Sequence, residues 1–264
     1  MTQWFFGCTG NAAQWFSEMI RVAVLSSREN TSLSANCLYD GEPCDLTDWM
    51  ASAGVNVIFT QVPFRDELFS DQIIQANRGS TYRSANACGH FLRAVVADYA
   101  SEETVIYTDC DVMFLADPKF EAPRTIAAAA EIDRKTFTPS PFSFNSGVMV
   151  LDVSHFRATK DDLISFFREH NFFDIAHGSY DQVLLNLYYR QTWTPLSADM
   201  NWRPASGINP NAQIVHFHGP KPHRVRAILD RAGIPEEAGL LEIIEHDRVA
   251  YNYYTNIFYQ YLRS

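Results

Sequence analysis

The sequence lacks several features that are typical of membrane proteins, secreted proteins and zinc-knuckle proteins. No apolar run approaches the length of a membrane span, and the apolar stretch 4–6 is too short for a signal-peptide core. The five cysteines are odd in number, scattered and without a C-x-x-C pair, which argues against a disulfide framework and a zinc knuckle. These absences predict a cytoplasmic protein without a transmembrane segment.

Positive charge is also scarce. The chain has 21 Lys and Arg residues against 31 Asp and Glu residues, so its formal net charge is −10. It contains no run rich in Lys or Arg that could overcome this charge locally. Since phosphate backbones and anionic lipids repel such a chain, nucleic acid is not an expected partner.

Length and patterning predict one α/β domain that spans residues 1–264. The composition is 47% hydrophobic and 14% aromatic, without repeats or low-complexity linkers. Short apolar runs alternate with helical patterns, which is typical of a mostly parallel, mixed sheet flanked by helices. Predicted strands cover 4–6, 34–38, 55–59, 104–107, 126–130, 148–151 and 213–217. Predicted helices cover 12–25, 85–99, 161–170 and 181–189.

Three helix details follow from the same patterns. Asn11 is the expected cap of the first long helix, and Asp45 the expected cap of a short one. After Asp247, an apolar stripe at four-residue spacing predicts a terminal helix that packs on the domain. The stripe consists of Val249, Tyr253, Ile257 and Tyr261, flanked by Ala250, Tyr254 and Phe258. A peripheral membrane contact or an oligomer contact is the alternative use of this helix.

The segment 105–114 carries the clearest chemical signal. Asp109 and Asp111 stand two residues apart where an apolar strand ends, so their carboxylates are expected on the same side. That position is the usual place for ligands in open α/β sheets. On its own an Asp-x-Asp pair is weak, because most such pairs are solvated loop residues.

A second segment, 213–223, supplies the groups that would complete a metal-bound diphosphate site. His216 and His218 lie at the end of a predicted strand. Gly219 allows a ligand to approach the backbone closely, and Lys221 can bind an anion. Two carboxylates with an imidazole favour Mn²⁺, with Mg²⁺ as the alternative. The spacing does not choose between His216 and His218 as the ligand.

Four motifs, in order, resemble those of the family 8 glycosyltransferases. They are Tyr-Thr-Asp-Cys-Asp at 107–111, Phe-Asn-Ser-Gly-Val-Met-Val-Leu at 144–151, Tyr-Asp-Gln-Val-Leu-Leu-Asn at 180–186 and His-Phe-His-Gly-Pro-Lys-Pro at 216–222. The resemblance implies a GT-A fold, with a nucleotide-binding half over about 1–115 and an acceptor half over about 116–264. It also implies a retaining hexosyl transfer from a nucleotide-diphosphate sugar, expected to be a UDP-sugar, to a glycan or glycolipid hydroxyl.

The resemblance also implies roles for individual residues. Asp109, Asp111 and His216 would bind the metal. The resemblance thus favours His216 over His218 as the histidine ligand. The nucleotide and diphosphate would contact Gly7, Thr9, Asn11, Arg93, Asp109, Cys110, Asp111, Gly219 and Lys221. Family members carry an acid that reads uracil near residues 7–11, where this chain offers only Thr9 and Asn11. For Arg93, an ordinary surface arginine is the alternative.

The sugar pocket and the catalytic groups are expected to come from Asn145, Asp181 and Gln182. An amide is a poor nucleophile beside a carboxylate, so same-face attack by the acceptor, with Gln182 positioning or stabilising, is favoured over a covalent intermediate. Glu131 or Asp133 could contact a sugar, but lone acids of this kind are more often solvated. A nucleotide-sugar hydrolase and a non-catalytic sugar-nucleotide or glycan-binding module are the alternative functions.

Overall fold

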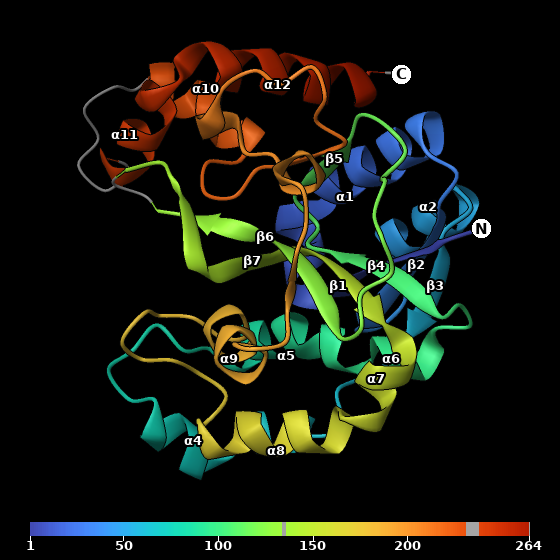
Figure 1. The fold of residues 1–264 in the computed structure, drawn as a ribbon, viewed down its shortest axis with the longest axis vertical. Helices are drawn as coiled ribbons and strands as arrows, with labels where there is room; N and C mark the ends of the chain where they lie inside the picture. The colour runs from blue at the N-terminus through green and yellow to red at the C-terminus, as the bar shows by residue number, and fades with distance from the viewer. Residues whose placement is uncertain (134–135, 231–237, 264) are drawn as a thin grey trace.

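Seven strands form a mixed sheet at the centre of the chain (Figure 1). The computed structural model describes residues 1–133, 136–230 and 238–263. The strand order is β3 (Asn56–Phe59), β2 (Ser34–Asp40), β1 (Gln3–Thr9), β4 (Thr104–Thr108), β7 (Pro139–Asp152), β6 (Ile126–Ile132) and β8 (Thr194–Pro195). The β4–β7 and β7–β6 pairs are antiparallel and the other pairs are parallel, which confirms a mostly parallel, mixed sheet.

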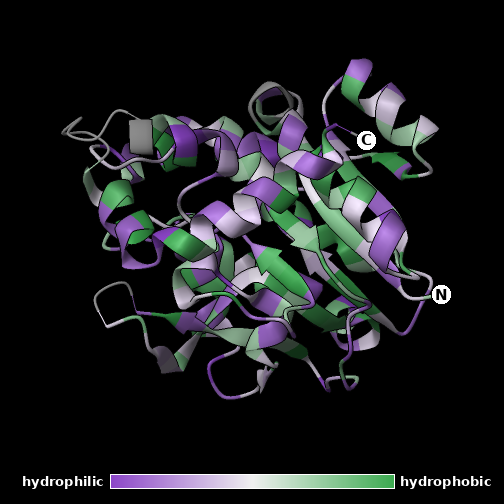
Figure 2. Ribbon diagram, turned by 90° about the horizontal axis from the view of Figure 1, so that it is seen from above, coloured by the Kyte–Doolittle hydropathy of each residue, from purple (hydrophilic) through white to green (hydrophobic). Residues whose placement is uncertain are grey.

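The central strands are apolar on both faces because both faces are covered. Trp4, Phe5 and Phe6 of β1 are all buried, as expected for a parallel strand between two helical layers. The one polar group of Trp4 is satisfied, since its Nε1 donates to Oγ1 of Thr108 at 2.9 Å. Figure 2 shows the hydrophobic strands between helices whose outer faces are more hydrophilic.

Helices cover the sheet on its two faces (Figure 1). One face is covered by α3 (Arg65–Leu68), α4 (Asp71–Ala76), α5 (Ser84–Phe91), the 3₁₀ turn η1 (Leu92–Val95), α6 (Val96–Tyr99), α7 (Val153–Ala158), α8 (Lys160–Glu169) and α9 (Gln182–Tyr188). The other face carries α1 (Gly10–Asn30) and α2 (Asp45–Ser52), and beyond them α10 (Pro222–Asp230), α11 (Ala238–His246) and α12 (Arg248–Tyr261).

A small second sheet brings distant segments of the chain together. In it β5 (Val112–Phe114) pairs antiparallel with β9 (Ile214–His216), and Val112 is the partner of His216. Two 3₁₀ turns, η2 (Ala198–Asn201) and η3 (Pro204–Ser206), precede β9. This pairing places the end of β9 beside the loop that follows β4.

Both predicted caps are wrong by one or two residues. β1 runs on to Thr9, whose Oγ1 accepts a hydrogen bond from the Ala12 N–H at 3.3 Å, so Asn11 lies inside the first turn of α1. Cys44 precedes α2, and its backbone N–H donates to Oγ1 of Thr47 at 2.8 Å, so Asp45 is the first helical residue.

The predicted helix over 85–99 is in fact three short pieces, α5, η1 and α6. All four residues of η1 are buried, so the apolar pattern continues across the tighter turn and gives no sign of it. The turn matters because it carries Arg93 into the interior.

The terminal helix packs on the domain as predicted, but the flanking residues rather than the first half of the stripe face inward. Val249 and Tyr253 are 70% and 46% exposed. The buried residues of α12 are Ala250, Tyr251, Tyr254, Thr255 and Phe258. The Asp247 carboxylate accepts from the Ala250 N–H at 2.9 Å, which fixes the start of the helix and so the face that it turns inward.

Two predicted absences can be compared with the structure. In the part of the chain that it describes, no helix is long and apolar enough to cross a membrane. All five cysteines are free thiols.

Candidate active site

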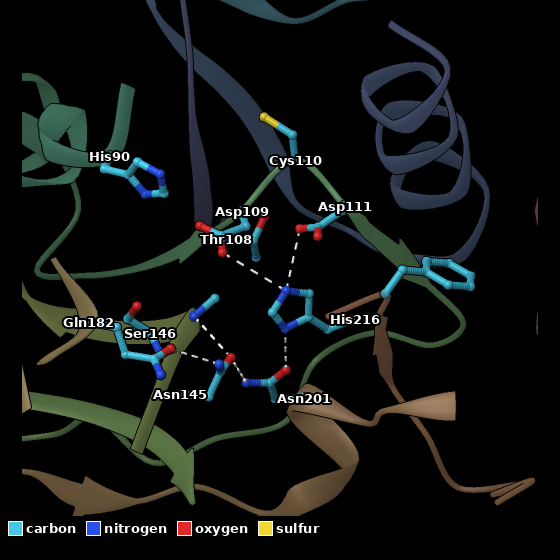
Figure 3. Close-up of polar contacts among 12 residues, drawn as sticks. His90, Thr108, Asp109, Cys110, Asp111, Asn145, Ser146, Gln182, Asn201 and His216 are labelled. Carbon is cyan, nitrogen blue, oxygen red and sulfur yellow. Dashed lines mark hydrogen bonds and ion pairs between the residues drawn. The ribbon is translucent and has the colours of Figure 1, made fainter. Parts of the chain in front are cut away.

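The loop between β4 and β5 presents its two aspartates to one side. Asp109 follows β4, and its backbone N–H donates to the Gly147 carbonyl of β7 at 2.8 Å. Cys110 turns the other way and donates its thiol hydrogen to the Gly7 carbonyl at 3.1 Å (Figure 3). The alternation expected for an extended chain therefore holds, and the Cys110 side chain faces away from the aspartates.

His216, the last residue of β9, completes a group of three. Its Nε2 lies 3.3 Å from Oδ1 of Asp111 and 3.9 Å from Oδ2 of Asp109 (Figure 3). One ligand atom from each residue lies within 4.8 Å of the others. This Nε2 is buried and, among the described residues, has no hydrogen-bond partner. The structure thus brings together the three residues for which a metal role was predicted.

Asn201 of η2 fixes the orientation of this imidazole. Its Oδ1 lies 2.9 Å from Nδ1 of His216, and its Nδ2 donates to Oδ1 of Asn145 at 2.9 Å. Because the amide nitrogen is engaged elsewhere, the oxygen faces the ring and accepts from Nδ1–H. That tautomer leaves a lone pair on Nε2, which is the form that binds a cation.

Gly147 of β7 is required by the same ring. A Cβ at this position would lie 2.1 Å from Cε1 of His216, so any side chain would displace the imidazole. The glycine in the Phe-Asn-Ser-Gly motif therefore has a packing reason that belongs to the site.

Each aspartate already has a cationic partner. The buried Arg93 places Nη2 at 2.7 Å from Oδ1 of Asp109, so its interpretation as a surface arginine is wrong. Lys221 forms a close ion pair with Asp111, and its Nζ also donates to the Phe217 carbonyl at 2.9 Å. Although burial opposes ionisation, Lys221 holds the pKa of Asp111 well below its usual range.

Asp181 is held by two groups on the opposite side of Arg93. Its Oδ2 lies 2.9 Å from Nη1 of Arg93, and its Oδ1 lies 3.1 Å from Nδ1 of His90. Burial alone would raise the pKa of this carboxyl, but Arg93 and His90 lower it to about 2. His90 also stacks on Tyr180, with ring centroids 4.5 Å apart. A lone histidine in a helical pattern gave no signal of this role.

Amide side chains from β7 and α9 form the next part of the site. Oε1 of Gln182 accepts from Nδ2 of Asn145 at 2.8 Å and from the Ser146 backbone N–H at 3.2 Å (Figure 3). Nε2 of Gln182 donates to Oε2 of Glu131 at 2.8 Å, and Nδ2 of Asn145 donates to the same oxygen at 3.0 Å. Both amides are thereby fixed in one orientation.

Glu131 is the acceptor at the centre of these amides, so the expectation that it is solvated is wrong. Its Oε1 forms a close ion pair with Nη1 of Arg203. Burial works against the charge, yet Arg203 lowers the pKa of Glu131 to about 2. Arg203 was missed because it lies far along the chain and in no recognised motif. Asp133 instead accepts from the Thr136 N–H at 2.8 Å, in the turn between β6 and β7.

The remaining predicted residues lie at the border of the site. Gly7 and Thr9 end β1, and Asn11 is exposed on the first turn of α1. Gly219 adopts a φ of +96°, a left-handed conformation that favours glycine. His218 lies next to His216, with ring centroids 5.4 Å apart. Burial, His216 and Arg203 lower the pKa of His218 to about 3.

Comparisons with known proteins bear on the fold and the family of the chain. Gly of Streptococcus gordonii, a probable glycosyl transferase, is 24% identical over 162 residues, which covers 54% of this chain and 23% of that protein. The glycosyltransferase GlyE of Streptococcus pneumoniae TIGR4 aligns with a TM-score of 0.59 and 17% identity, over 92% of this chain and 63% of GlyE. The chain thus spans less than two thirds of the length of both relatives.

A third relative matches over its whole length. An active-site mutant of LgtC aligns with a TM-score of 0.60 and 16% identity, over 90% of this chain and all of LgtC. These likenesses confirm the predicted GT-A fold. The family model for glycosyl transferase family 8 matches residues 19–224, which is most of the chain. The chain therefore belongs to glycosyltransferase family 8.

Proposed function

We propose that this chain transfers a hexose from a nucleotide-diphosphate sugar, a UDP-sugar in the first instance, to a hydroxyl of a glycan or glycolipid, with retention of configuration and with Mn²⁺. The observation that carries the proposal is the buried Nε2 of His216, which faces two carboxylates. Family membership and the solved structure of LgtC with donor and acceptor sugar analogues support transfer as the reaction.

The residues present fit a divalent cation. A buried imidazole nitrogen without a protein partner is costly, and a metal would satisfy it together with Asp109 and Asp111. Mixed oxygen and nitrogen donors favour Mn²⁺ over Mg²⁺. A cation held there would supply positive charge beside the departing diphosphate.

Lys221 would supply the second positive charge on the diphosphate. Its ammonium now pairs with Asp111 and would turn to a phosphate oxygen when the donor binds. Asp181 and Asn145 would hold sugar hydroxyls, because both are buried, fixed and close to Gln182.

Gln182 is better suited to stabilising the reacting centre than to attacking it. Its Oε1, the only atom that could act as a nucleophile, already accepts two hydrogen bonds, from Asn145 and from the Ser146 N–H. This supports same-face attack, in which the acceptor hydroxyl forms the new bond while the leaving phosphate oxygen takes its proton.

Product analysis tests the proposal against its alternatives. Incubation with a panel of nucleotide sugars and Mn²⁺ should give sugar on an acceptor, with the same anomeric configuration as in the donor by NMR. Free sugar alone would indicate a hydrolase, and unchanged donor that nevertheless binds would indicate a binding module. A thermal-shift panel of nucleoside diphosphates with and without Mn²⁺ identifies the base, because ligand binding raises the melting temperature.

A further inference from the structure

Arg203 has a buried guanidinium group, and only one of its three nitrogens contacts a hydrogen-bond or ion-pair partner. It stands between η2 and η3, and its side chain is 7% exposed. Nη1 pairs with Oε1 of Glu131. Within the described residues 1–133, 136–230 and 238–263, Nε and Nη2 are buried and have no hydrogen-bond acceptor.

Two unsatisfied nitrogens of a buried cation, with three N–H donors between them, are a large cost to leave in a folded protein. Each buried donor without an acceptor costs about 1–3 kcal/mol, and more when it is charged. The Nε and Nη2 donors of a guanidinium lie in one plane, with a spacing that matches the two oxygens of a carboxylate or phosphate. The free edge of Arg203 therefore has the shape of an oxyanion site.

A small cavity lies against this side chain. Its walls include Ile132 and Phe137 from the β6–β7 hairpin and Ile243 from α11, with His218 and Gly219 beside them. The apolar walls keep the local dielectric low, which strengthens a charge-assisted hydrogen bond to a bound anion. Because the chain carries a net charge of −10, attraction to an anion has to come from a local cation of this kind.

The position of Glu131 indicates which substrate the cavity serves. Its Oε2 accepts from Asn145 and Gln182, while its Oε1 pairs with Arg203. Glu131 thus separates Arg203 from Asn145, proposed to hold the donor sugar, and from Gln182, proposed to stabilise the reacting centre. Lys221, the cation proposed for the diphosphate, is paired instead with Asp111.

We propose that Arg203 binds an anionic substituent, a carboxylate or phosphate, on the acceptor sugar through its Nε and Nη2. This inference rests on the proposed function, since it assigns the acceptor class to the same site. The acceptor is then an acidic or phosphorylated glycan, and a neutral acceptor of the same shape would leave the guanidinium unsatisfied.

The test measures binding of three probes to the full chain with saturating UDP and Mn²⁺. The probes are methyl glucuronide, glucose 6-phosphate and methyl glucoside. At least one anionic probe should bind about 10-fold more tightly than methyl glucoside, and the stronger of the two identifies carboxylate or phosphate. Equal binding of all three, or binding of none, overturns the inference even when UDP and Mn²⁺ bind normally. Failure of UDP and Mn²⁺ to bind would instead count against the proposed function.

Variants test whether Arg203 causes the preference for an anionic probe over methyl glucoside. Arg203→Met should abolish the preference for the anionic probe, while Arg168→Met, which removes an exposed pair with Glu67, should retain it. Arg203→Lys keeps a charge opposite Glu131 but loses the planar fork, so it should fold and still lose most of the preference. A preference that survives in Arg203→Lys and Arg203→Met overturns the assignment. So does a 10-fold loss of UDP affinity in these variants, because the fork would then bind the diphosphate.

Discussion

The two sides of the site satisfy their polar groups in opposite ways. On the aspartate side, Asp109 and Asp111 come from the β4–β5 loop and His216 from the end of β9, and Nε2 of His216 has no partner among the described residues. On the amide side, Asn145 and Gln182 are hydrogen-bonded to each other and to Glu131. The aspartate side thus leaves Nε2 of His216 without a partner, while the Asn145 and Gln182 amides are already organised.

This difference indicates how the work of catalysis is divided. In the proposed function the aspartate side binds a cation and the diphosphate, so it should control nucleotide binding. The amide side is fixed before any ligand arrives, which is the arrangement expected of groups that stabilise a transition state without reorganising. Changes on the two sides should therefore affect different measured quantities.

The largest effect is expected from Asp109→Asn and Asp111→Asn. Loss of either carboxylate removes a predicted metal ligand, so metal-dependent nucleotide binding and transfer should fall together, transfer by about 1000-fold or more. Isothermal titration with UDP and Mn²⁺ and an initial-rate assay measure the two quantities. Asp117→Asn, which alters only a surface contact with Ser32, is the matched control. Full Mn²⁺-dependent turnover in both variants would defeat the metal assignment.

Gln182→Ala should show most clearly that the amide side affects turnover while the aspartate side affects nucleotide binding. Turnover should fall by about 100-fold or more, because the group proposed to stabilise the reacting centre is lost, while the affinity for UDP and Mn²⁺ changes little. Steady-state kinetics beside nucleotide titration tests this. Gln75→Ala, on the exposed surface of α4, is the control. If turnover is unchanged, Gln182 has no part in the reaction.

Asn201→Ala tests the connection between the sides. It removes the acceptor for Nδ1–H of His216, while Asn145 keeps its other contacts. Loss of a group that orients a metal-binding histidine typically costs 10–100-fold in metal affinity, so the Mn²⁺ concentration for half-maximal rate should rise by about 10-fold or more. Asn211→Ala, at an exposed position, should leave that concentration unchanged. A normal Mn²⁺ dependence in Asn201→Ala would show that the imidazole does not need this partner.

The same contrast explains what the sequence could reveal. Asp109, Asp111, His216 and Lys221 lie in short segments whose spacing carries chemical meaning, so the predicted group appears in the structure as one cluster. The central strands were predictable because their apolar runs are continuous and buried. The GT-A arrangement followed from the order of the motifs rather than from periodicity.

The amide side could be predicted only in part. Asn145 and Gln182 stand in motifs, but Arg203, Asn201 and His90 reach the site through turns that no periodic pattern marks. Glu131 looked like a solvated acid because its partner, Arg203, is 72 positions away. The 3₁₀ turn at η1 was missed for a similar reason, since tertiary burial rather than local propensity sets it.

The smallest effect concerns the stability of the amide side and its dependence on pH. The pKa of Glu131 is lowered to about 2, below the ordinary value of a glutamate, because of Arg203 and despite burial. A lowered carboxyl pKa contributes stability that is fully present above the ordinary value and is lost as pH falls toward 2. Glu131→Gln should therefore reduce the free energy of unfolding at pH 7 by no more than about 3 kcal/mol.

The gap between wild type and Glu131→Gln should close as the pH is lowered from about 4.5 toward 2, where the wild-type carboxyl becomes protonated. Urea unfolding at a series of pH values measures this gap. Glu67→Gln, which removes an exposed pair with Arg168, should change stability little at any pH because exposed ion pairs contribute little. A gap that stays constant down to pH 2 would mean that Glu131 stabilises the amides through packing and hydrogen bonds, independently of its charge. Arg203 would then be held by the fold and not by its ion pair with Glu131.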